Sequence, residues 1–487
     1  MRAFMTKILF AASEAVPFIK TGGLADVVGS LPKYLDKDEY DVRVIVPRYT
    51  CMDDNLKKIL RFHSHFYVSL GWRRQYAGIL TVQYDNVIYY FVDNEYYFSG
   101  DRPYHNIYED VEKFAFFSRA VLDALPVINF CPDIIHCHDW QTGLIPVYLT
   151  NLYQDQPFYK NIKTVFSIHN MKFQGRWRLN AVADVTGLPE ELFRPGTGGL
   201  EAYGEANYLK GGILFADIVT TVSPTYANEI QTPAGGEGLD GLMRMRSGSL
   251  YGILNGIDYE LYNPKTDSHM AKHFGTLDFV PGKKANKAAL QELLHLPKRE
   301  DVFLISMVSR LTDQKGFDLV AYDLDEVLAK DPVQFVVLGT GEEKYEKMLR
   351  YFAEKYPDKL VISTDYSESL AHKIYASSDA FLMPSLFEPC GLSQLMSMRY
   401  GTVPMVRETG GLKDTVKAYN EYENTGNGFS FCNFNAQEMS DMIHYAMHVY
   451  FDDRVHWNEM AVRCMEMDYS WDNSAKEYGR LYKQLVQ

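Results

Sequence analysis

The chain has 487 residues, and at about 100–200 residues per domain this length predicts two or three domains and excludes a single small module. Lys and Arg total 49 against 63 Asp and Glu, and the net charge of −14 argues against a nucleic-acid-binding surface over the whole molecule. The hydrophobic share of 46% and the charged share of 23% are typical of folded soluble domains, so they exclude a disordered chain and a membrane bundle.

The N-terminus resembles a signal peptide only in its first residues. Arg2 and Lys7 precede an apolar run, but Glu14 follows soon after Ala12, so the run falls short of the about 7–15 apolar residues that such a peptide needs. No stretch reaches the about 18 apolar residues of a membrane span. Six scattered cysteines without a CxxC pair argue against a disulfide framework or zinc ribbon and favour reduced thiols in the cytoplasm: Cys51, Cys131, Cys137, Cys390, Cys432 and Cys464.

Short apolar, β-branched runs alternate with longer helical stretches along the chain. Continuous apolar runs are typical of strands that helices bury on both faces, so they predict an α/β fold with two doubly wound domains. The predicted strands of the first half lie at 7–13, 41–47, 86–92, 133–139, 163–170 and 216–223. Those of the second half lie at 302–310, 333–341, 359–366, 379–385, 402–408 and 428–434.

Turn-forming pairs separate these two sets of strands. Asn255-Gly256 and Asn263-Pro264 indicate a crossing between domains, and we place a hinge at 251–264. The first domain then covers 1–250 and the second 265–465. The final segment, 466–487, is predicted to be helical, and its pattern alone does not tell which domain it joins.

Two loops that follow predicted strands carry cations and glycines. Ligands of open α/β sheets bind at such positions, beyond the carboxyl ends of the strands. Lys20, Gly22 and Gly23 suit a phosphate-binding loop, because glycines let backbone N–H groups approach an anion, although the same pattern also fits a simple turn. Arg310 and Lys315 offer a second cationic loop, unless they are ordinary surface charges.

The segment His136-Cys137-His138-Asp139-Trp140 ends a predicted strand and raises the question of a metal site. Alternation along the strand sends His136 and His138 to one face and Cys137 to the other, and no second ligand pair is near in sequence, so we expect no metal. An acid and an aromatic ring at a strand end instead suit sugar binding. Trp140 would stack on a pyranose and Asp139 would accept hydroxyl protons.

Other polar residues at strand ends allow both a functional and a structural interpretation. Glu388, between a strand and a helix predicted to begin near Leu392, suits sugar hydroxyls or a helix N-terminus. Cys390 has no histidine near in sequence, which argues against a nucleophile. Tyr366 suits a nucleobase or simple packing. The Asp323-Leu324-Asp325 triplet resembles a metal-binding DxD, but we interpret it as the solvated face of a helix.

Taken together, these segments closely resemble the bacterial glycogen synthases and plant starch synthases. The matching motifs span nearly the whole chain in the order of that family: KTGGLADVVGSLP at 20–32, HCHDWQTGLIP at 136–146, FSIHNMKFQG at 166–175, ADIVTTVSPTYANEI at 216–230, GILNGID at 252–258, SRLTDQKGFDL at 309–319, FEPCGLSQLMSMRYGTVPMVRETGGLKDTV at 387–416, and YSWDNSA at 469–475.

The resemblance implies two Rossmann-like domains of the GT-B fold that face each other across a deep cleft, with the first domain on the acceptor glucan side and the second on the nucleotide-sugar side. The final helix would return to the first domain. The implied reaction moves glucose from ADP-glucose to the non-reducing 4-hydroxyl of an α-1,4-glucan such as glycogen, with retention of configuration and release of ADP. No cofactor, metal, nucleic-acid or membrane partner is implied.

The resemblance also assigns residues. Glu388, Asp139, His169, Lys315 and Arg310 are the implied catalytic residues; Arg310 and Lys315 would hold the distal phosphate, His169 would lie near the anomeric centre, and Glu388 would bind the transferred glucose. The implied substrate-binding residues are Lys20, Gly22, Gly23, Asp26, Trp140, Asn170, Asn255, Gln314, Tyr366, Cys390, Gly391 and Leu392. The alternatives are another retaining GT-B glucosyltransferase that uses UDP-glucose, and an inactive glucan-binding scaffold.

Overall fold

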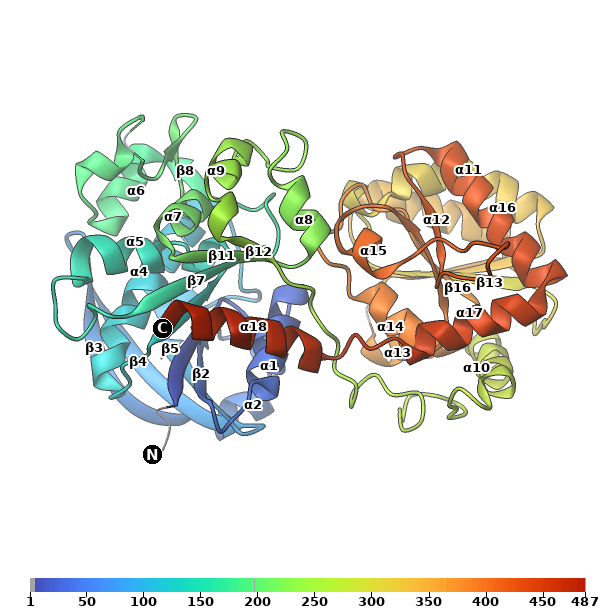
Figure 1. Ribbon diagram of the computed structural model, residues 1–487, viewed down its shortest axis with the longest axis horizontal. Helices are drawn as coiled ribbons and strands as arrows, with labels where there is room; N and C mark the ends of the chain where they lie inside the picture. The colour runs from blue at the N-terminus through green and yellow to red at the C-terminus, as the bar shows by residue number, and fades with distance from the viewer. Residues whose placement is uncertain (1–4, 197, 366, 487) are drawn as a thin grey trace. The chain divides into compact units, whose positions relative to one another are not determined.

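The chain forms two compact units. The computed structural model describes residues 5–196, 198–365 and 367–486. Unit 1 contains the described residues up to Leu254 and from Trp471 onwards, and unit 2 runs from Asn255 to Ser470. The chain therefore passes between the units at 254–255, inside the segment predicted as a hinge, and again at 470–471 (Figure 1).

Unit 1 has a nine-stranded sheet as its centre. Its strands are β1 (Thr6–Ala11), β2 (Tyr40–Pro47), β3 (Arg61–Leu70), β4 (Arg73–Tyr84), β5 (Val87–Asp93), β6 (Ile134–His138), β7 (Lys163–Ile168), β11 (Ile218–Thr221) and β12 (Leu250–Gly252). They are arranged in the order β12-β11-β7-β6-β1-β2-β5-β4-β3, and all pairs are parallel except those that β4 makes with β5 and β3. A small antiparallel sheet is formed by β8 (Arg176–Arg178), β9 (Glu201–Ala202) and β10 (Glu205–Asn207).

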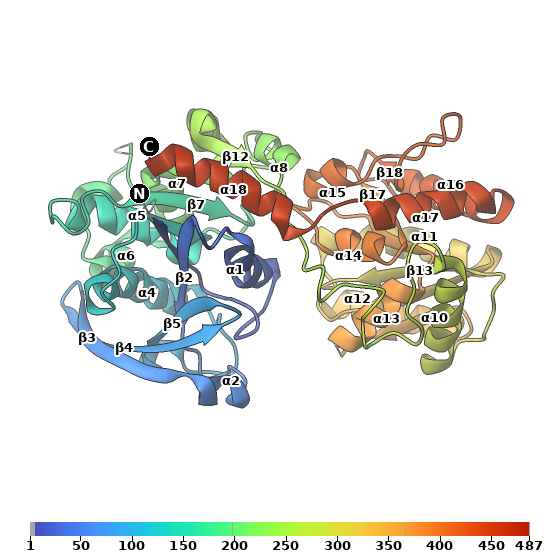
Figure 2. The same cartoon turned by 60° about the horizontal axis from the view of Figure 1, so that its bottom comes forward.

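All six strands predicted for the first half of the chain are present as β1, β2, β5, β6, β7 and β11. The sequence prediction missed the β3–β4 hairpin, which forms the outer edge of the sheet (Figure 2). The residues of β3 alternate in exposure over much of its length instead of forming one apolar run. An edge strand with one solvated face shows this alternation, which a search for continuous apolar runs does not detect.

Helices cover both faces of the unit 1 sheet. They are α1 (Gly23–Tyr34), α2 (Asp54–Ile59), α3 (Glu95–Phe98), α4 (Ile107–Val127), α5 (Leu144–Tyr148), α6 (Leu179–Thr186), α7 (Tyr208–Phe215), α8 (Pro224–Glu229), α9 (Asp240–Met245) and α18 (Trp471–Val486). The C-terminal helix α18 packs beside α1 (Figures 1 and 2). The Tyr40 hydroxyl donates a hydrogen bond to the carbonyl of Gly479 at 3.0 Å, and Trp471 is buried. Helix α18 therefore belongs to unit 1.

Unit 2 has a six-stranded sheet in which every pair is parallel. Its strands are β13 (Phe303–Val308), β14 (Val333–Leu338), β15 (Leu360–Ser363), β16 (Ala380–Met383), β17 (Val403–Arg407) and β18 (Phe429–Phe431), in the order β15-β14-β13-β16-β17-β18. All six correspond to predicted strands. Its helices are α10 (Phe279–Leu293), α11 (Phe317–Lys330), α12 (Glu343–Lys355), α13 (Glu368–Ser377), α14 (Ser393–Arg399), α15 (Gly410–Thr415), α16 (Ala436–Asp452) and α17 (Arg454–Glu466).

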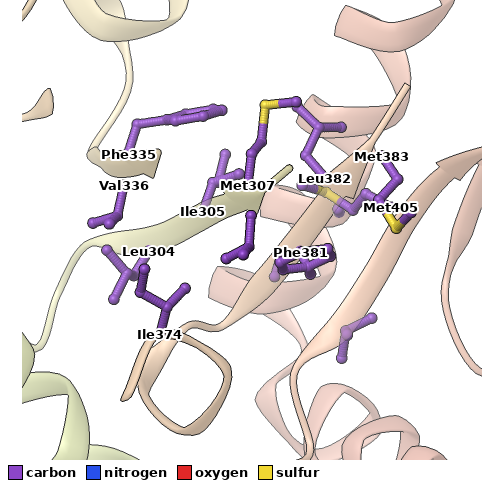
Figure 3. Packing of buried hydrophobic residues seen from close by; sticks show 14 of the residues in the cluster. Leu304, Ile305, Met307, Phe335, Val336, Ile374, Phe381, Leu382, Met383 and Met405 are labelled. Atoms are coloured by element: carbon purple, nitrogen blue, oxygen red, sulfur yellow. The ribbon is translucent and has the colours of Figure 1, made fainter. Parts of the chain in front are cut away.

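The core of unit 2 lies where these central strands meet the helices. Every residue of β13 and β14 is buried, and their apolar side chains pack with those of β16 (Figure 3). Leu304, Phe335 and Phe381 represent the three strands in this cluster. Burial on both faces is the reason that these segments are continuous apolar runs in the sequence.

The strand order reverses at the centre of both sheets. In unit 1, β1 lies between β2 and β6, and in unit 2, β13 lies between β14 and β16. At such a switch point, the loops that leave adjacent strands diverge to opposite faces and open a crevice for ligands. The topology thus selects the loops after β1 and β6 in unit 1, and those after β13 and β16 in unit 2. Among the described residues, no helix is both long enough and apolar enough to cross a membrane.

Candidate active site

The loops after β13 and β16 bring a lysine and a glutamate together in unit 2. Lys315 Nζ lies 2.6 Å from Glu388 Oε2, although the two residues are 73 positions apart in the chain. The Ser385 hydroxyl donates a second hydrogen bond to the same carboxylate oxygen at 3.0 Å. Glu388 is only 6% exposed, so water screens this ion pair weakly. The predicted roles of Lys315 and Glu388 thus fall on residues in direct contact.

Backbone and side-chain hydrogen bonds tie the same two loops to each other. The Leu386 N–H donates to the Gln314 carbonyl at 2.8 Å, and the buried Gln314 amide donates to the Phe387 carbonyl at 3.3 Å. Arg407, at the end of β17, donates from Nε to the Ser385 carbonyl at 2.7 Å. Gln314 therefore holds the loop that carries Glu388. The sequence interpretation missed Ser385 and Arg407, because neither belongs to the two predicted loops of cations and glycines.

A glycine at the start of α15 packs against the backbone of Glu388. Gly410 has a φ of 45°, which L side chains rarely adopt, and a Cβ built there would lie 2.0 Å from the Glu388 carbonyl oxygen. The Gly411 N–H donates to that same carbonyl at 3.2 Å. A larger residue at 410 would therefore displace the backbone of Glu388.

The remaining candidates of unit 2 differ in their exposure and contacts. Arg310 is exposed beyond the end of β13, and its side chain makes no salt bridge with the described residues. Burial raises the pKa of Cys390 to about 12, so the thiol stays protonated, which agrees with the argument against a nucleophile. Asn255 is buried, and its Oδ1 has no hydrogen-bond partner in the described part of the chain. Gly391 has a φ of 70°, and Leu392 directly precedes α14.

Tyr366 and the acidic triplet on α11 are the other two features that the sequence singled out in unit 2. Tyr366, expected at the nucleobase, lies outside the described residues. The assignment of Asp323 to a solvated helix face is wrong, because Asp323 is 7% exposed and burial raises the pKa of its carboxyl. Asp325 is exposed and accepts hydrogen bonds from Lys355 at 2.6 Å and Tyr356 at 2.8 Å.

In unit 1, the loop after β1 contains the predicted phosphate-binding residues. Lys20 Nζ lies 2.8 Å from Asp26 Oδ1, and both side chains are partly exposed. The buried carboxylate of Glu14 accepts hydrogen bonds from the Thr21 backbone N–H and from its hydroxyl, the latter at 2.6 Å. Gly22 precedes the first turn of α1 with an extended backbone, and a Cβ built on it meets no atom within 4 Å. Glu14 therefore holds the loop through Thr21, while the space beside Gly22 is unoccupied by protein atoms.

Of the residues in this loop, Gly23 was predicted from the sequence and Glu14 was not. Gly23 is the first residue of α1 and is exposed, so the backbone at the start of this helix is accessible to solvent. The role of Glu14 was missed, because in the sequence it only marks the end of an apolar run. No sequence signal could have found it, because a single acidic residue after a strand does not show whether its side chain is buried.

Asp139 connects the ends of β6 and β7. Its backbone is left-handed, with a φ of 57°, and its Oδ1 accepts the His169 backbone N–H at 2.7 Å. Burial raises the pKa of Asp139 to about 7, while this N–H and that of Asn170 act in the opposite direction. The carboxylate thus orients the His169-Asn170 turn. Asn170 itself is partly exposed and accepts the Lys172 N–H at 3.0 Å.

Trp140 does not have the predicted geometry. The indole is 7% exposed, packs edge-on against Phe114 with ring centroids 5.2 Å apart, and lies so close to Gly175 that a Cβ there would be 2.2 Å from Cε3. The prediction that Trp140 stacks on a pyranose is therefore wrong, because protein atoms occupy the positions that a sugar would need. Trp140 is a core residue at the edge of the site.

The histidines of β6 share a face, as strand alternation predicted. The rings of His136 and His138 stack with centroids 4.2 Å apart. Both nitrogens of His136 are hydrogen-bonded within the protein, Nδ1 to the Tyr482 hydroxyl at 2.7 Å and Nε2 to the Ser167 hydroxyl at 2.6 Å. No cluster of three or more histidine, cysteine or acidic side chains with metal-binding geometry occurs among the described residues.

Comparison with known proteins places this site in a family. A profile described as "Starch synthase catalytic domain" matches residues 7–245, and one described as "Glycosyl transferases group 1" matches residues 294–463. The glycogen synthase of Lachnospira eligens is 58% identical over 481 residues, which cover 99% of this chain and 100% of that protein. The chain belongs to the glycogen and starch synthase family. The glycogen synthase of Lachnoclostridium phytofermentans is 55% identical with the same coverage.

Solved structures agree with this family and fold. The structure described as the catalytic domain of Starch Synthase IV from Arabidopsis thaliana bound to ADP and acarbose has a TM-score of 0.91 and 32% sequence identity, and covers 99% of this chain and 100% of that one. A sucrose-phosphate synthase from Thermosynechococcus elongatus has a TM-score of 0.62 at 15% identity, with 99% of each chain covered, which shows the fold alone. The predicted Rossmann-like GT-B domains, glycosyltransferase activity and glycogen synthase function are thereby confirmed.

Proposed function

We propose that this glycogen synthase family member transfers glucose from ADP-glucose to the non-reducing 4-hydroxyl of an α-1,4-glucan, with retention of configuration and release of ADP. The buried contact between Lys315 and Glu388 carries the proposal, because it joins a cation for the donor phosphate to an acceptor for sugar hydroxyls. The ADP and acarbose bound by the Arabidopsis relative support the same pair of substrates.

Unit 2 supplies the nucleotide-sugar side in this proposal. Arg310 is exposed, and Lys315 retains some exposure, so both cations can meet a diphosphate at the end of β13. A bidentate guanidinium and a point-charge ammonium stabilise the negative charge that develops on the departing ADP. Glu388 would accept hydrogen bonds from the transferred glucose. Asn255, Cys390, Gly391 and Leu392 would line the same pocket.

Unit 1 supplies the glucose and acceptor side. The open backbone at Gly22, followed by the exposed start of α1, offers N–H groups to the donor phosphate or glucose, with Lys20 as an added cation. His169 and Asn170 would contact the sugar, in a turn that Asp139 holds in place. Asp26 would contact the adenosine once Lys20 turns to the phosphate.

These groups also support a reaction without a metal cofactor. In unit 2, the cations Arg310 and Lys315 can neutralise a leaving diphosphate, which is the charge that a divalent ion would otherwise meet. The acidic triplet on α11 does not suit a metal-bound diphosphate, since Asp325 is engaged by Lys355 and Tyr356 and Asp323 is buried.

The proposal is tested by glucose incorporation into glycogen by the purified chain, with ADP-glucose and UDP-glucose compared and EDTA present throughout. Incorporation from ADP-glucose is the expected result, and it supports the donor and the metal independence together. Incorporation from UDP-glucose alone would overturn the donor assignment. Failure with both donors, in a protein that is folded by circular dichroism, would favour the alternative of an inactive glucan-binding scaffold.

A further inference from the structure

A buried histidine in unit 1 has a hydrogen-bonding pattern that this mechanism leaves unused. His138, the last residue of β6, is fully buried, and its Nδ1 lies 3.0 Å from Nε2 of His169, the first residue after β7. The other ring nitrogen of His138, Nε2, is also buried and has no hydrogen-bond partner in the described ranges. Nδ1 of His138 is therefore hydrogen-bonded to His169, and Nε2 is buried without a hydrogen-bond partner among the described residues.

The protonation state of the two rings follows from their surroundings. Burial lowers the pKa of His138 well below its ordinary value and lowers the pKa of His169 to about 3. Both imidazoles are therefore neutral at neutral pH, and each carries one N–H. The 3.0 Å contact needs one proton between the two nitrogens, so one ring donates and the other accepts.

The isolated nitrogen decides which ring is the donor. If His169 donated from Nε2, the proton of His138 would sit on its own Nε2, as a buried N–H without an acceptor. Orphaned buried N–H groups are rare in proteins, whereas an acceptor that lacks a partner is better tolerated. With the proton of His138 on Nδ1, the hydrogen bond to His169 forms and only a bare lone pair is left in the core.

We propose that His138 is a positioning residue that holds His169 in its Nδ1–H tautomer, so that His169 meets the substrate as a hydrogen-bond donor. Because His169 Nε2 accepts the proton of His138, its own proton must be on Nδ1. This Nδ1 makes no hydrogen bond with another described residue, and His169 is partly exposed. The inference rests on the proposed function for its claim that His169 faces the sugar.

The ring of His138 is held so that it cannot offer the other nitrogen. It stacks on His136 with centroids 4.2 Å apart and on Phe10 with centroids 5.5 Å apart. His136 is itself fixed by hydrogen bonds to Ser167 and to Tyr482 on α18. The C-terminal helix thus contributes to the orientation of a residue at the site through two stacked imidazoles.

A neutral donor has an advantage over a charged one at this position. Cleavage of the glycosidic bond generates positive charge at the anomeric carbon, and an imidazolium nearby would repel it. A neutral Nδ1–H can donate to a sugar oxygen without adding charge. The backbone of His169 is fixed as well, because its N–H donates to Asp139 at 2.7 Å. Two adjacent residues of β6 and its loop therefore hold His169, one by its backbone and one by its ring.

The test is ¹⁵N NMR of the histidine rings in the full chain, with His169→Gln used to assign the signals of His169. A matched pair of variants reads out the role of the proton. His138→Asn places an amide N–H near the position of Nδ1, and His138→Asp has nearly the same shape but, measured at a pH where its buried carboxyl is ionised, only acceptor oxygens. We expect the Nδ1–H tautomer at His169 in the wild type and in His138→Asn. In His138→Asp, we expect the proton of His169 to move to Nε2.

Turnover is expected to follow the tautomer. His138→Asn should keep kcat within about tenfold of the wild type, whereas His138→Asp should lose about 10²–10³ in kcat, the usual loss for one misplaced donor, with KM less affected. An Nε2–H tautomer at His169 in the wild type would overturn the inference, and so would equal kcat values in the two variants. If the wild type shows the Nδ1–H tautomer but transfers no glucose, the proposed function fails and the tautomer assignment stands.

Discussion

Each of the two units pairs a lysine from the loop after its central strand with a carboxylate, but the two pairs are built in different ways. In unit 1, Lys20 and Asp26 are 6 residues apart, and their side chains are 34% and 23% exposed. In unit 2, Lys315 and Glu388 are 73 residues apart, and their side chains are 16% and 8% exposed. Exposed pairs contribute about 0–1 kcal/mol, whereas removal of one partner of a buried pair costs about 3–5 kcal/mol.

The exposed pair in unit 1 suits exchange with a ligand, whereas the buried pair in unit 2 suits a fixed orientation of its carboxylate. The pair in unit 1 is weak and local, so Lys20 can exchange its carboxylate for a ligand phosphate at little cost. The pair in unit 2 joins two loops that are distant in sequence. Gln314 ties these loops together and Arg407 holds the loop of Glu388 to the end of β17, so Glu388 is oriented before any substrate arrives. Preorganised charge of this second kind is the larger contributor to catalysis.

The largest effect is expected from Glu388→Ala. Loss of this carboxylate removes the proposed sugar ligand and leaves Lys315 without its buried partner, so turnover should fall by at least about 100-fold. Initial rates of glucose incorporation measure the effect, and Lys315→Ala should show a loss of the same order. Glu388→Gln keeps the shape without the charge and serves as the control for packing. Near-normal turnover in a folded Glu388→Ala protein would contradict the role of this residue.

An intermediate effect is expected from Gly410→Ala in unit 2. A left-handed alanine costs about 1–2 kcal/mol, and the clash with the Glu388 carbonyl adds about 1–3 kcal/mol, so the free energy of unfolding should fall by about 2–5 kcal/mol. Chemical denaturation measures this change. The matched control is Gly22→Ala in unit 1, where the backbone is extended and a Cβ meets nothing, and a change within about 1 kcal/mol is expected. Equal losses in the two variants would remove the contrast between the loops.

The smallest effect is expected from Asp26→Ala. Its ion pair with Lys20 is partly exposed, so the free energy of unfolding should change by no more than about 1 kcal/mol, and by less at high salt. Denaturation at two ionic strengths checks both statements. A loss of several kcal/mol would show that the pair in unit 1 is as structural as the one in unit 2.

Most strands could be predicted from the sequence, and those that were missed are β3 and β4 at one end of the large sheet and the short strands β8, β9, β10 and β12. The buried parallel strands are continuous apolar runs because helices cover both faces, and each of these predicted runs is a strand. The β3–β4 hairpin lies at the sheet edge. The residues of β3 alternate in exposure and form no such run, whereas β4 contains an apolar stretch at 76–82 that the sequence prediction missed. The same limit applied to Glu14, whose burial cannot be inferred from a single acidic residue after a strand.

The candidate site was predictable in its composition but not in its contacts. Lys20, Lys315 and Glu388 stand out because charged residues follow apolar runs. Trp140 has the same position relative to its strand, yet it is buried beneath Gly175, which lies 35 positions further along the chain. Whether an aromatic ring at a strand end faces a ligand or the core depends on that remote backbone, so sequence position alone could not distinguish the two.

Local pattern by itself determines where this chain forms its buried parallel strands, where it turns between the two units, and which loops carry cations and glycines, because these properties depend on residues a few positions apart. The contacts of Lys315 with Glu388 and of His138 with His169 join residues 73 and 31 positions apart. Only the strand order, β13 beside β16 and β6 beside β7, brings each pair together. That order follows from the packing of whole helices and strands in each unit, which no local stretch of sequence encodes.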